Sequence, residues 1–209
     1  MSVTVVCVLK SGGVYNPEWV YKLASGVKQN LSRPYDFVCL SDQTISGVDV
    51  VPLVNHWPGW WSKLEIFRPR LFTGSVLYID LDSIVVGPLD NLFSQTVLYM
   101  CEDFTFDGFN SSVMSWNSYF FSPYSLYEYF ASDPGSLMKF YDRNVRGRVG
   151  DQAYIEDRTR PRCFPPGKIV SYKKSKGAMP KSSTSIVAFH GKPKPNQTGD
   201  WAQRAWEAL

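Results

Sequence analysis

The chain has 209 residues, of which 44% are hydrophobic and 15% aromatic, and its formal net charge is +3. This composition predicts one compact domain, residues 1–209, with a sizeable core. No run approaches the roughly 18 apolar residues that a membrane-spanning helix needs, and residues 1–9 lack the basic segment expected of a signal peptide.

The N-terminal quarter of the chain predicts two kinds of element in turn. Residues 3–9 form an unbroken apolar run, which is typical of a buried parallel strand. Asn16 followed by Pro17 predicts the start of a helix, because asparagine caps helices and proline suits the first helical position. Residues 37–40 and 48–51 predict two further strands. This order predicts an α/β fold with a mostly parallel central sheet flanked by helices, and ligands collect at the carboxyl ends of such strands.

Ser62 and Glu65 have the spacing of a capping box, which predicts that a helix begins at this serine. Lys63 then lies in the first helical turn, where the helix dipole disfavours a cation. We expect this lysine either to be solvated at the surface or to reach an anion bound nearby.

Two aspartates, Asp80 and Asp82, interrupt the apolar and β-prone run 76–86. Alternation along a strand places both carboxylates on one side and Leu81 on the other. Neighbouring carboxylates repel each other unless a cation lies between them, and oxygen ligands of this kind suit Mg²⁺ or Mn²⁺. The alternative is a strand that ends in two solvated loop acids without a metal.

The second half of the chain has weaker periodicity. Asn110 and Ser111 precede an apolar segment, where they either bind hydroxyl groups of a polar ligand or form a turn. Residues 159–183 are rich in Pro, Lys and Ser and are expected to be irregular. Residues 185–189 predict a strand, and a short helix is expected from Asp200.

His190 comes directly after the last predicted strand. One interpretation is a hydrogen-bonded structural histidine; the other is a third metal ligand beside Asp80 and Asp82. Its imidazole nitrogen favours Mn²⁺ over Mg²⁺. In the second interpretation Lys192 and Lys194, each next to a proline, face a phosphate.

Charge is distributed unevenly along the chain. Between Arg158 and Arg204 there are eleven Lys or Arg residues and one acid, Asp200, whereas the rest of the chain has eleven basic and eighteen acidic residues. A basic C-terminal third suits an anionic ligand, a phosphorylated substrate or an anionic membrane surface, although a solvated basic face explains it equally well. No nucleic-acid partner is expected, because the aromatic residues are scattered through core-like segments.

Four cysteines, Cys7, Cys39, Cys101 and Cys163, are widely spaced. Their spacing matches neither a zinc site nor a dense disulfide framework. We therefore expect reduced thiols and a cytoplasmic location.

Six elements together resemble the retaining glycosyltransferases of family 8, which have the Rossmann-like GT-A fold and include bacterial lipopolysaccharide glycosyltransferases. In chain order these elements are Tyr15, Lys63, Asp80-Leu81-Asp82, Asn110-Ser111-Ser112, Asp151-Gln152 and His190-Gly191-x-x-Lys194. The resemblance extends over nearly the whole chain. It implies a nucleotide-binding half, residues 1–100, that contains the aspartate pair, and a sugar and acceptor half, residues 101–209.

The resemblance also implies roles for individual residues. Asp80, Asp82 and His190 are expected to bind Mn²⁺, which bridges the diphosphate of a UDP-sugar. Asp151 and Gln152 are expected to lie beneath the anomeric carbon of that sugar. Leu9, Ser11 and Tyr15 are expected to hold the uridine base, and Gly191 with either Lys192 or Lys194 the diphosphate. Lys63, Asn110 and Ser111 are expected to be further donor contacts.

We therefore expect a metal-dependent transferase that moves a hexose from a UDP-sugar to a glycan or lipid-linked acceptor with retention. Retention requires either Asp151 as a nucleophile or front-face attack by the acceptor hydroxyl group. Two alternatives are a non-catalytic protein that binds sugar nucleotides or glycans, and a phosphohydrolase of the haloacid dehalogenase type, which also has two aspartates after a buried strand.

Overall fold

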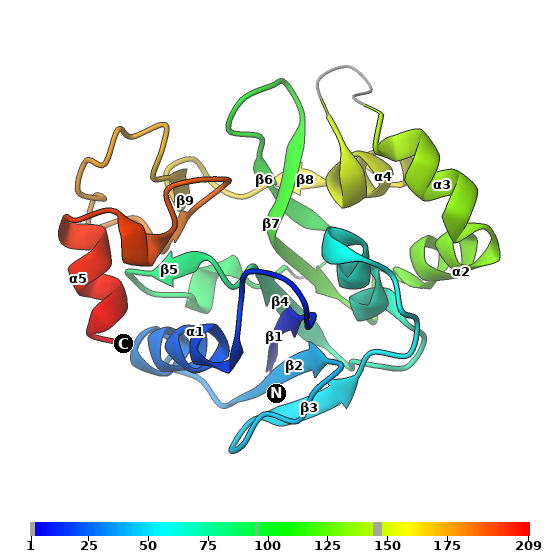
Figure 1. Ribbon diagram of the computed structural model, residues 1–209, viewed down its shortest axis with the longest axis horizontal. Helices are drawn as coiled ribbons and strands as arrows, with labels where there is room; N and C mark the ends of the chain where they lie inside the picture. The colour runs from blue at the N-terminus through cyan, green and yellow to red at the C-terminus, as the bar shows by residue number, and fades with distance from the viewer. Residues whose placement is uncertain (1–2, 95, 144–147) are drawn as a thin grey trace.

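The computed structural model describes residues 3–94, 96–143 and 148–209. Seven strands form a large sheet in the order β3-β2-β1-β4-β7-β6-β8 (Figure 1). In chain order these are β1 (Val3–Leu9), β2 (Tyr35–Ser41), β3 (Asp49–Pro52), β4 (Ser75–Ile79), β6 (Tyr99–Glu102), β7 (Phe109–Asn117) and β8 (Arg162–Cys163). A smaller sheet consists of β5 (Ser83–Val85), β10 (Ile186–Ala188) and β9 (Ile169–Ser171), in that spatial order.

The predicted mostly parallel sheet is confirmed. β1 pairs in parallel with β2 on one side and β4 on the other, and β2–β3 and β6–β8 are also parallel. Within the described sheet, β7 alone runs antiparallel to its neighbours, β4 and β6. Six of the seven residues of β1 are buried, because a central strand of such a sheet is covered on both faces.

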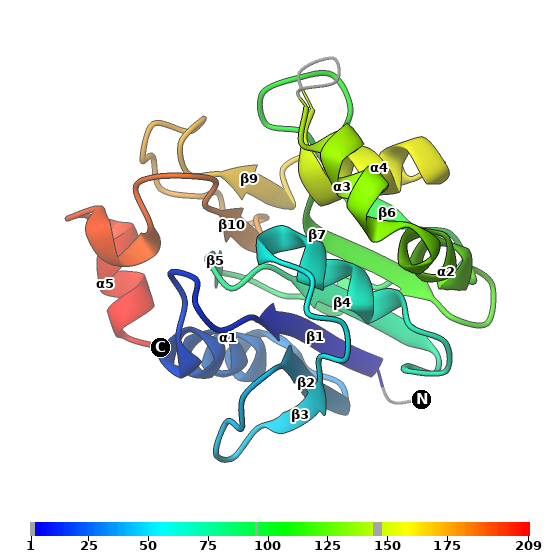
Figure 2. The same cartoon turned by 45° about the vertical axis from the view of Figure 1, so that its right-hand side comes forward.

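Helices cover both faces of the large sheet (Figure 2). One face packs against α1 (Pro17–Asn30), and the other against η1 (Gly59–Phe67), α2 (Tyr124–Ser132), α3 (Pro134–Tyr141) and α4 (Gly150–Arg158). The C-terminal helix α5 (Trp201–Glu207) lies beside α1 and contacts β5 of the smaller sheet (Figure 1). The side chains of β1 alternate accordingly: Val5 and Cys7 belong to the first core and Val6 to the second. None of the described helices is long and apolar enough to cross a membrane.

The predicted start of α1 is confirmed. The Asn16 side chain accepts a hydrogen bond from the Glu18 backbone N–H at 3.0 Å, and Pro17 is the first helical residue. The helix then buries Trp19, Leu23 and other apolar residues against the sheet. These contacts fix the loop 10–16, which leads from β1 toward the candidate site.

The predicted capping box at Ser62 is wrong. The segment is a 3-10 helix that begins at Gly59, and the Ser62 hydroxyl donates to the Gly59 carbonyl oxygen at 2.8 Å. The Glu65 side chain is fully buried and accepts from the backbone N–H groups of Val54 and Asn55 at 2.8 and 2.9 Å. The Glu65 carboxylate therefore satisfies backbone N–H groups of the neighbouring loop and does not cap η1.

The irregular segment expected at residues 159–183 contains two short strands, β8 and β9. The predicted strand 185–189 is confirmed as β10, with bounds one residue shorter at each end. The helix expected from Asp200 is confirmed as α5, which this aspartate caps.

Candidate active site

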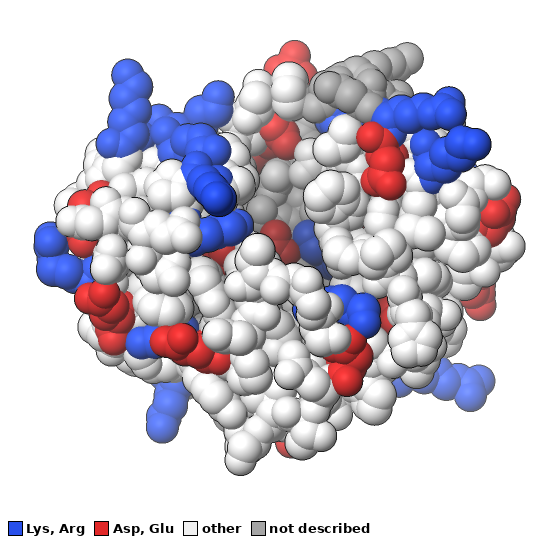
Figure 3. Space-filling view, in the orientation of Figure 1, with Lys and Arg blue, Asp and Glu red and all other residues white. Residues whose placement is uncertain are grey.

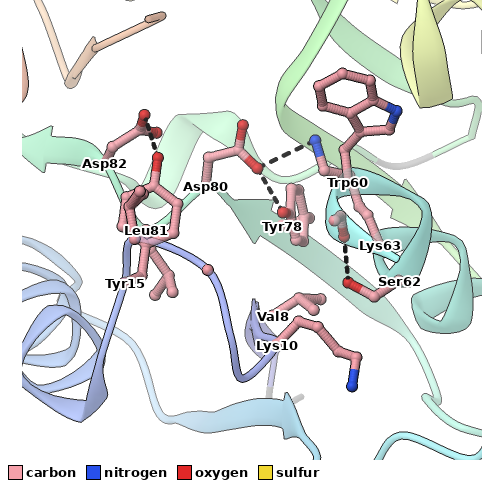
Figure 4. A pocket seen from close by; sticks show the side chains of 13 residues that line it. Val8, Lys10, Tyr15, Trp60, Ser62, Lys63, Tyr78, Asp80, Leu81 and Asp82 are labelled. Carbon is pink, nitrogen blue, oxygen red and sulfur yellow. Dashed lines mark hydrogen bonds and ion pairs between the residues drawn. The ribbon is translucent and has the colours of Figure 1, made fainter. Parts of the chain in front are cut away.

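A cavity of about 350 Å³ opens at the carboxyl ends of β1 and β4 (Figure 4). These strands are parallel neighbours, so their ends meet at one edge of the sheet, where ligands of α/β proteins bind. The lining residues are Val8, Lys10, Gly13, Val14, Tyr15, Gly59, Trp60, Ser62, Lys63, Tyr78, Asp80, Leu81 and Asp82. Four of the predicted site residues, Tyr15, Lys63, Asp80 and Asp82, thus line this cavity.

Asp80 and Asp82 lie in the tight turn between β4 and β5. β4 ends at Ile79, and the Ser83 backbone N–H donates to the Asp80 carbonyl oxygen at 3.1 Å. Both aspartates line the cavity, as predicted, although a turn places them there and strand alternation does not. Leu81 is buried in the core and anchors the turn.

Lys63 is buried between two carboxylates. Its ammonium nitrogen lies 3.1 Å from Asp80 Oδ1 and 3.0 Å from Asp151 Oδ2, and it donates to Ser111 Oγ at 3.0 Å. The Ser111 hydroxyl in turn donates to Asp151 Oδ2 at 2.6 Å. Only 9% of the lysine side chain is exposed. The solvated alternative for Lys63 is therefore wrong; the anion that it reaches is part of the protein.

Burial and charge determine the protonation of this cluster. Burial lowers the pKa of Lys63, but Asp151 and Asp80 outweigh it, and the pKa is raised overall. Burial raises the pKa of Asp80 to about 6. The positive charge of Lys63 lowers this pKa and the negative charge of Asp82 raises it, but burial has the largest effect. The Tyr78 hydroxyl donates to Asp80 Oδ1 at 2.5 Å. Lys63 therefore stays charged at neutral pH, and an added cation near Asp80 favours the ionised carboxylate.

The carboxylate of Asp82 is paired with a different lysine, Lys194. Asp82 Oδ2 accepts from the Tyr15 hydroxyl at 2.8 Å and from the Lys194 ammonium group at 2.5 Å. Lys194 also donates to the Tyr15 hydroxyl at 2.7 Å. These contacts bring the C-terminal segment to the aspartate turn, whereas Lys192 is exposed.

Asn110 and Gln152 are also brought together. Asn110 Nδ2 donates to Gln152 Oε1 at 3.1 Å, and Gln152 Nε2 donates to Asp103 Oδ2 at 3.2 Å. Asp103 was not predicted from the sequence. It accepts from two following backbone N–H groups, an Asx-turn pattern that gives no sign of its contact with Gln152.

Of the residues predicted to hold the uridine base, Tyr15 lines the cavity, whereas Leu9 and Ser11 do not. The Leu9 side chain is fully buried in the core. Ser11 donates to Asp42 through its backbone N–H at 2.8 Å and its hydroxyl at 2.6 Å, and Lys10 forms an ion pair with the same carboxylate. Asp42, which directly follows β2, was not among the predicted donor contacts. Gly191 has φ +71°, and a Cβ there would lie 3.3 Å from Lys173 Nζ.

Several solved glycosyltransferase structures share this architecture. GlyE of Streptococcus pneumoniae TIGR4 superposes with a TM-score of 0.72 and 15% sequence identity, and the match covers 98% of this chain and 60% of GlyE. The apo form of GlyE gives a TM-score of 0.71 and 16% identity, and that match covers 98% of this chain and 59% of GlyE. An active-site mutant of LgtC gives 0.66 at 13%, covering 98% and 94% of the two chains. This chain has a GT-A glycosyltransferase fold.

The predicted fold is thereby confirmed. The galactosyltransferase LgtC in complex with donor and acceptor sugar analogs also matches, with a TM-score of 0.64, 13% identity and the same coverage. The chain spans about three fifths of the length of the GlyE structures. No protein-family model matches the chain, and no curated protein matches it in sequence.

The chemistry of the aspartate turn fits a hard dication in part. The described contacts use Oδ1 of Asp80 and Oδ2 of Asp82, so one oxygen of each carboxylate takes no part in them. His190 Nε2 is hydrogen-bonded to Ser171 Oγ at 2.7 Å, and its ring stacks on Phe104. Residues 3–94, 96–143 and 148–209 contain no group of three metal-ligating side chains. Two carboxylates fit such an ion here, and the third ligand stays a prediction.

Sequence reasoning missed Trp60, whose indole projects over the cavity beside Lys63 (Figure 4). Its side chain is 53% exposed, whereas the neighbouring Trp57 and Trp61 are buried. The sequence shows a loop rich in Trp and Pro, but it does not indicate which indole faces solvent.

Proposed function

We propose that the protein is a glycosyltransferase that moves a hexose from a UDP-sugar to a glycan or lipid-linked acceptor with retention. The observation that carries this proposal is the cavity at the carboxyl end of the GT-A sheet, where Asp80 and Asp82 lie side by side with Lys63 and Lys194. Paired carboxylates and ammonium groups suit a diphosphate and its counter-ion. The fold of GlyE and LgtC supports the same conclusion.

Mn²⁺, or alternatively Mg²⁺, is the proposed counter-ion, with Asp80 and Asp82 as ligands and His190 as the third. Burial and the nearby charge of Lys173 lower the pKa of His190, so its imidazole is neutral at neutral pH and suited to metal binding. When bound, the dication would neutralise charge on the departing diphosphate.

The protein's own groups account for the rest of the reaction. Leaving-group departure builds negative charge on the β-phosphate, and Lys194 or Lys192 would stabilise it from the C-terminal segment. Asp151 is proposed to lie beneath the anomeric carbon, where its carboxylate stabilises positive charge or attacks as a nucleophile. Lys63 and Ser111 orient this carboxylate through Oδ2. Gln152 is held by Asn110 and Asp103 beside it.

One observation favours a second candidate, a sugar-nucleotide-binding protein without turnover. Each aspartate of the turn is already neutralised by a lysine, so a donor could bind without the complete metal site that transfer requires. The phosphohydrolase alternative loses its support, because the aspartate pair follows the fourth strand of a GT-A sheet and not the first strand of a phosphohydrolase core.

The test measures binding, donor hydrolysis and transfer separately. Wild-type protein is titrated with UDP, UDP-glucose and UDP-galactose, with and without Mn²⁺, and release of UDP is then followed. We expect Mn²⁺-dependent binding and turnover, and loss of turnover in Asp82→Ala while the protein stays folded. Binding without turnover in the wild type would establish the second candidate. Full turnover in Asp82→Ala would refute the assignment.

The basic C-terminal third is proposed to contact anionic membrane surfaces that carry a lipid-linked acceptor. Figure 3 shows Lys and Arg side chains gathered over β9 and the loop that follows it, beside the hollow of the site. Lys173, Lys174 and Lys176 in this loop are exposed. Such a cluster attracts anionic lipid head groups.

A further inference from the structure

A second hollow lies beside the donor cavity. It has a volume of about 430 Å³ and is lined by Pro58, Gly59, Trp60, Trp61, Asp142 and Val149. This volume is within the range of about 300–1,000 Å³ that is typical of small-molecule sites. Gly59 and Trp60 line both hollows, so the two adjoin at these residues. The proposed mechanism does not use the second hollow.

The indole of Trp60 is exposed but held in place. A Cβ atom on Gly150 would lie 2.6 Å from Trp60 Nε1, and Gly150 has φ +71°, so only glycine lets the ring approach the start of α4 this closely. The next residues of α4 are Asp151 and Gln152, the proposed catalytic pair. A flat apolar surface is thus fixed next to the position proposed for the reacting carbon.

We propose that this hollow is the acceptor subsite and that it binds a neutral saccharide. In this arrangement one pyranose ring stacks its C–H face on the Trp60 indole. The exposed Asp142 carboxylate, at the C-terminal end of α3, accepts hydrogen bonds from sugar hydroxyl groups. This inference rests on the proposed function.

Two features select this occupant. An acceptor must reach the anomeric carbon from a site that adjoins the donor cavity, and Trp60 lines both hollows. Asp142 repels a phosphorylated ligand, whereas a carboxylate beside an aromatic ring suits hydroxyl groups and C–H groups together. The uridine base is expected at Leu9, Ser11 and Tyr15, none of which lines the second hollow.

The experiment uses the full chain in Trp60→Ala, Trp60→Phe and Asp142→Ala variants, with Phe120→Ala as the matched control. Phe120 is 68% exposed and lines neither hollow. Binding of the methyl glycosides of glucose, galactose and N-acetylglucosamine, and of lactose, is measured by saturation-transfer NMR and titration in the presence of UDP. Affinity for UDP is measured in parallel, and circular dichroism verifies folding.

We expect Trp60→Ala to weaken saccharide binding at least tenfold and UDP binding much less. Trp60→Phe should restore part of the lost saccharide affinity. Asp142→Ala should weaken saccharide binding several-fold. Phe120→Ala should match the wild type. The subsite is overturned if no saccharide binds, or if Trp60→Ala weakens UDP and saccharide equally, which would assign the indole to the nucleotide. Failure of the proposed function would give a different result from failure of the subsite. The wild type would then show no UDP-sugar turnover, while the dependence of saccharide binding on Trp60 would still be measurable.

Discussion

Lys194 makes contacts that differ from the role predicted for it. It was expected to face a phosphate, and in the structure it donates to Asp82 at 2.5 Å and to the Tyr15 hydroxyl. An ammonium group on a carboxylate competes with any other cation for that carboxylate. The same lysine can therefore neutralise Asp82 before the donor binds and the diphosphate afterwards.

This competition gives a first prediction for Lys194→Met. Without UDP, Mn²⁺ should bind several-fold more tightly than to the wild type, because the carboxylate has lost its cation. UDP should bind about ten- to a hundredfold more weakly, because a charge-assisted contact to phosphate is worth about 1.5–3 kcal/mol. Electron paramagnetic resonance of free Mn²⁺ and calorimetric titration with UDP measure the two affinities.

Lys192→Met is the matched control, because this lysine is two residues away and exposed. Its Mn²⁺ affinity should equal that of the wild type. An unchanged Mn²⁺ affinity in Lys194→Met would show that Asp82 is not a ligand. A larger loss of UDP affinity in Lys192→Met would assign the diphosphate to Lys192.

At the site, the sequence predicted some of the residues that meet, namely Tyr15, Lys63, Asp80 and Asp82, but not how they pair. Asp80 and Asp82 were placed at the edge of a parallel sheet because an apolar run ends there. The pairing of Lys63 with Asp151, 88 positions later in the chain, depends on how η1 and α4 pack on β7, and no local pattern records that packing. The exposure of Trp60 likewise follows from its neighbours in space.

Elements were predictable where local chemistry and tertiary contacts agree. Residues 3–9 form a strand with the predicted bounds, because an apolar run and burial on both faces require the same conformation. The capping box at Ser62 failed because Glu65 is taken by the N–H groups of residues 54 and 55. β8 and β9 were missed because strands of two and three residues in a Pro-rich segment depend on their partners and not on their own pattern.

The cap of α5 gives a prediction at this scale. Asp200 accepts from the Ala202 backbone N–H at 2.9 Å and from the Tyr172 hydroxyl at 2.7 Å, and the Tyr172 ring stacks on Phe189 beside His190. Asp200→Ala should lower the free energy of unfolding by about 1–2 kcal/mol at pH 7, because it removes a helix cap and an inter-element hydrogen bond. Chemical denaturation followed by circular dichroism measures the change.

The pH dependence tests the charge of this cap. Burial raises the pKa of Asp200, but hydrogen bonds from Tyr172 and Ala202 outweigh it, and the pKa lies below its ordinary value of 3.8. The folded state therefore favours the carboxylate, and the stability it adds is complete above about pH 4 and is lost as the pH falls through the lowered pKa. Asp200→Asn should be less stable than the wild type at pH 7 and approach it near pH 2. A difference that does not change with pH would mean that the charge of Asp200 contributes nothing.

Over the whole molecule, charge is divided between an acidic body and a basic C-terminal third, and this third also supplies His190 and Lys194 to the site. A membrane surface that attracted the basic third would hold the mouth of the site near lipid-linked acceptors. The uneven distribution matters for this more than the net charge of +3, because the attraction falls off within about 8–10 Å at physiological salt.

Two charge-reversal pairs separate local charge from net charge. Lys174 and Lys181 are exposed in the basic third, and Lys28 and Lys139 are exposed on the body.

We expect the wild type to bind vesicles of 70% phosphatidylcholine and 30% phosphatidylglycerol in co-sedimentation, and to bind them more weakly at higher salt. It should not bind vesicles of pure phosphatidylcholine. Lys174→Glu with Lys181→Glu should weaken binding at least tenfold, since each lysine near the surface contributes about 1 kcal/mol. Lys28→Glu with Lys139→Glu makes the same change in net charge and should weaken binding much less. Equal losses in the two pairs would mean that net charge alone governs the attraction, and the basic third would then have no special orientation toward the lipid.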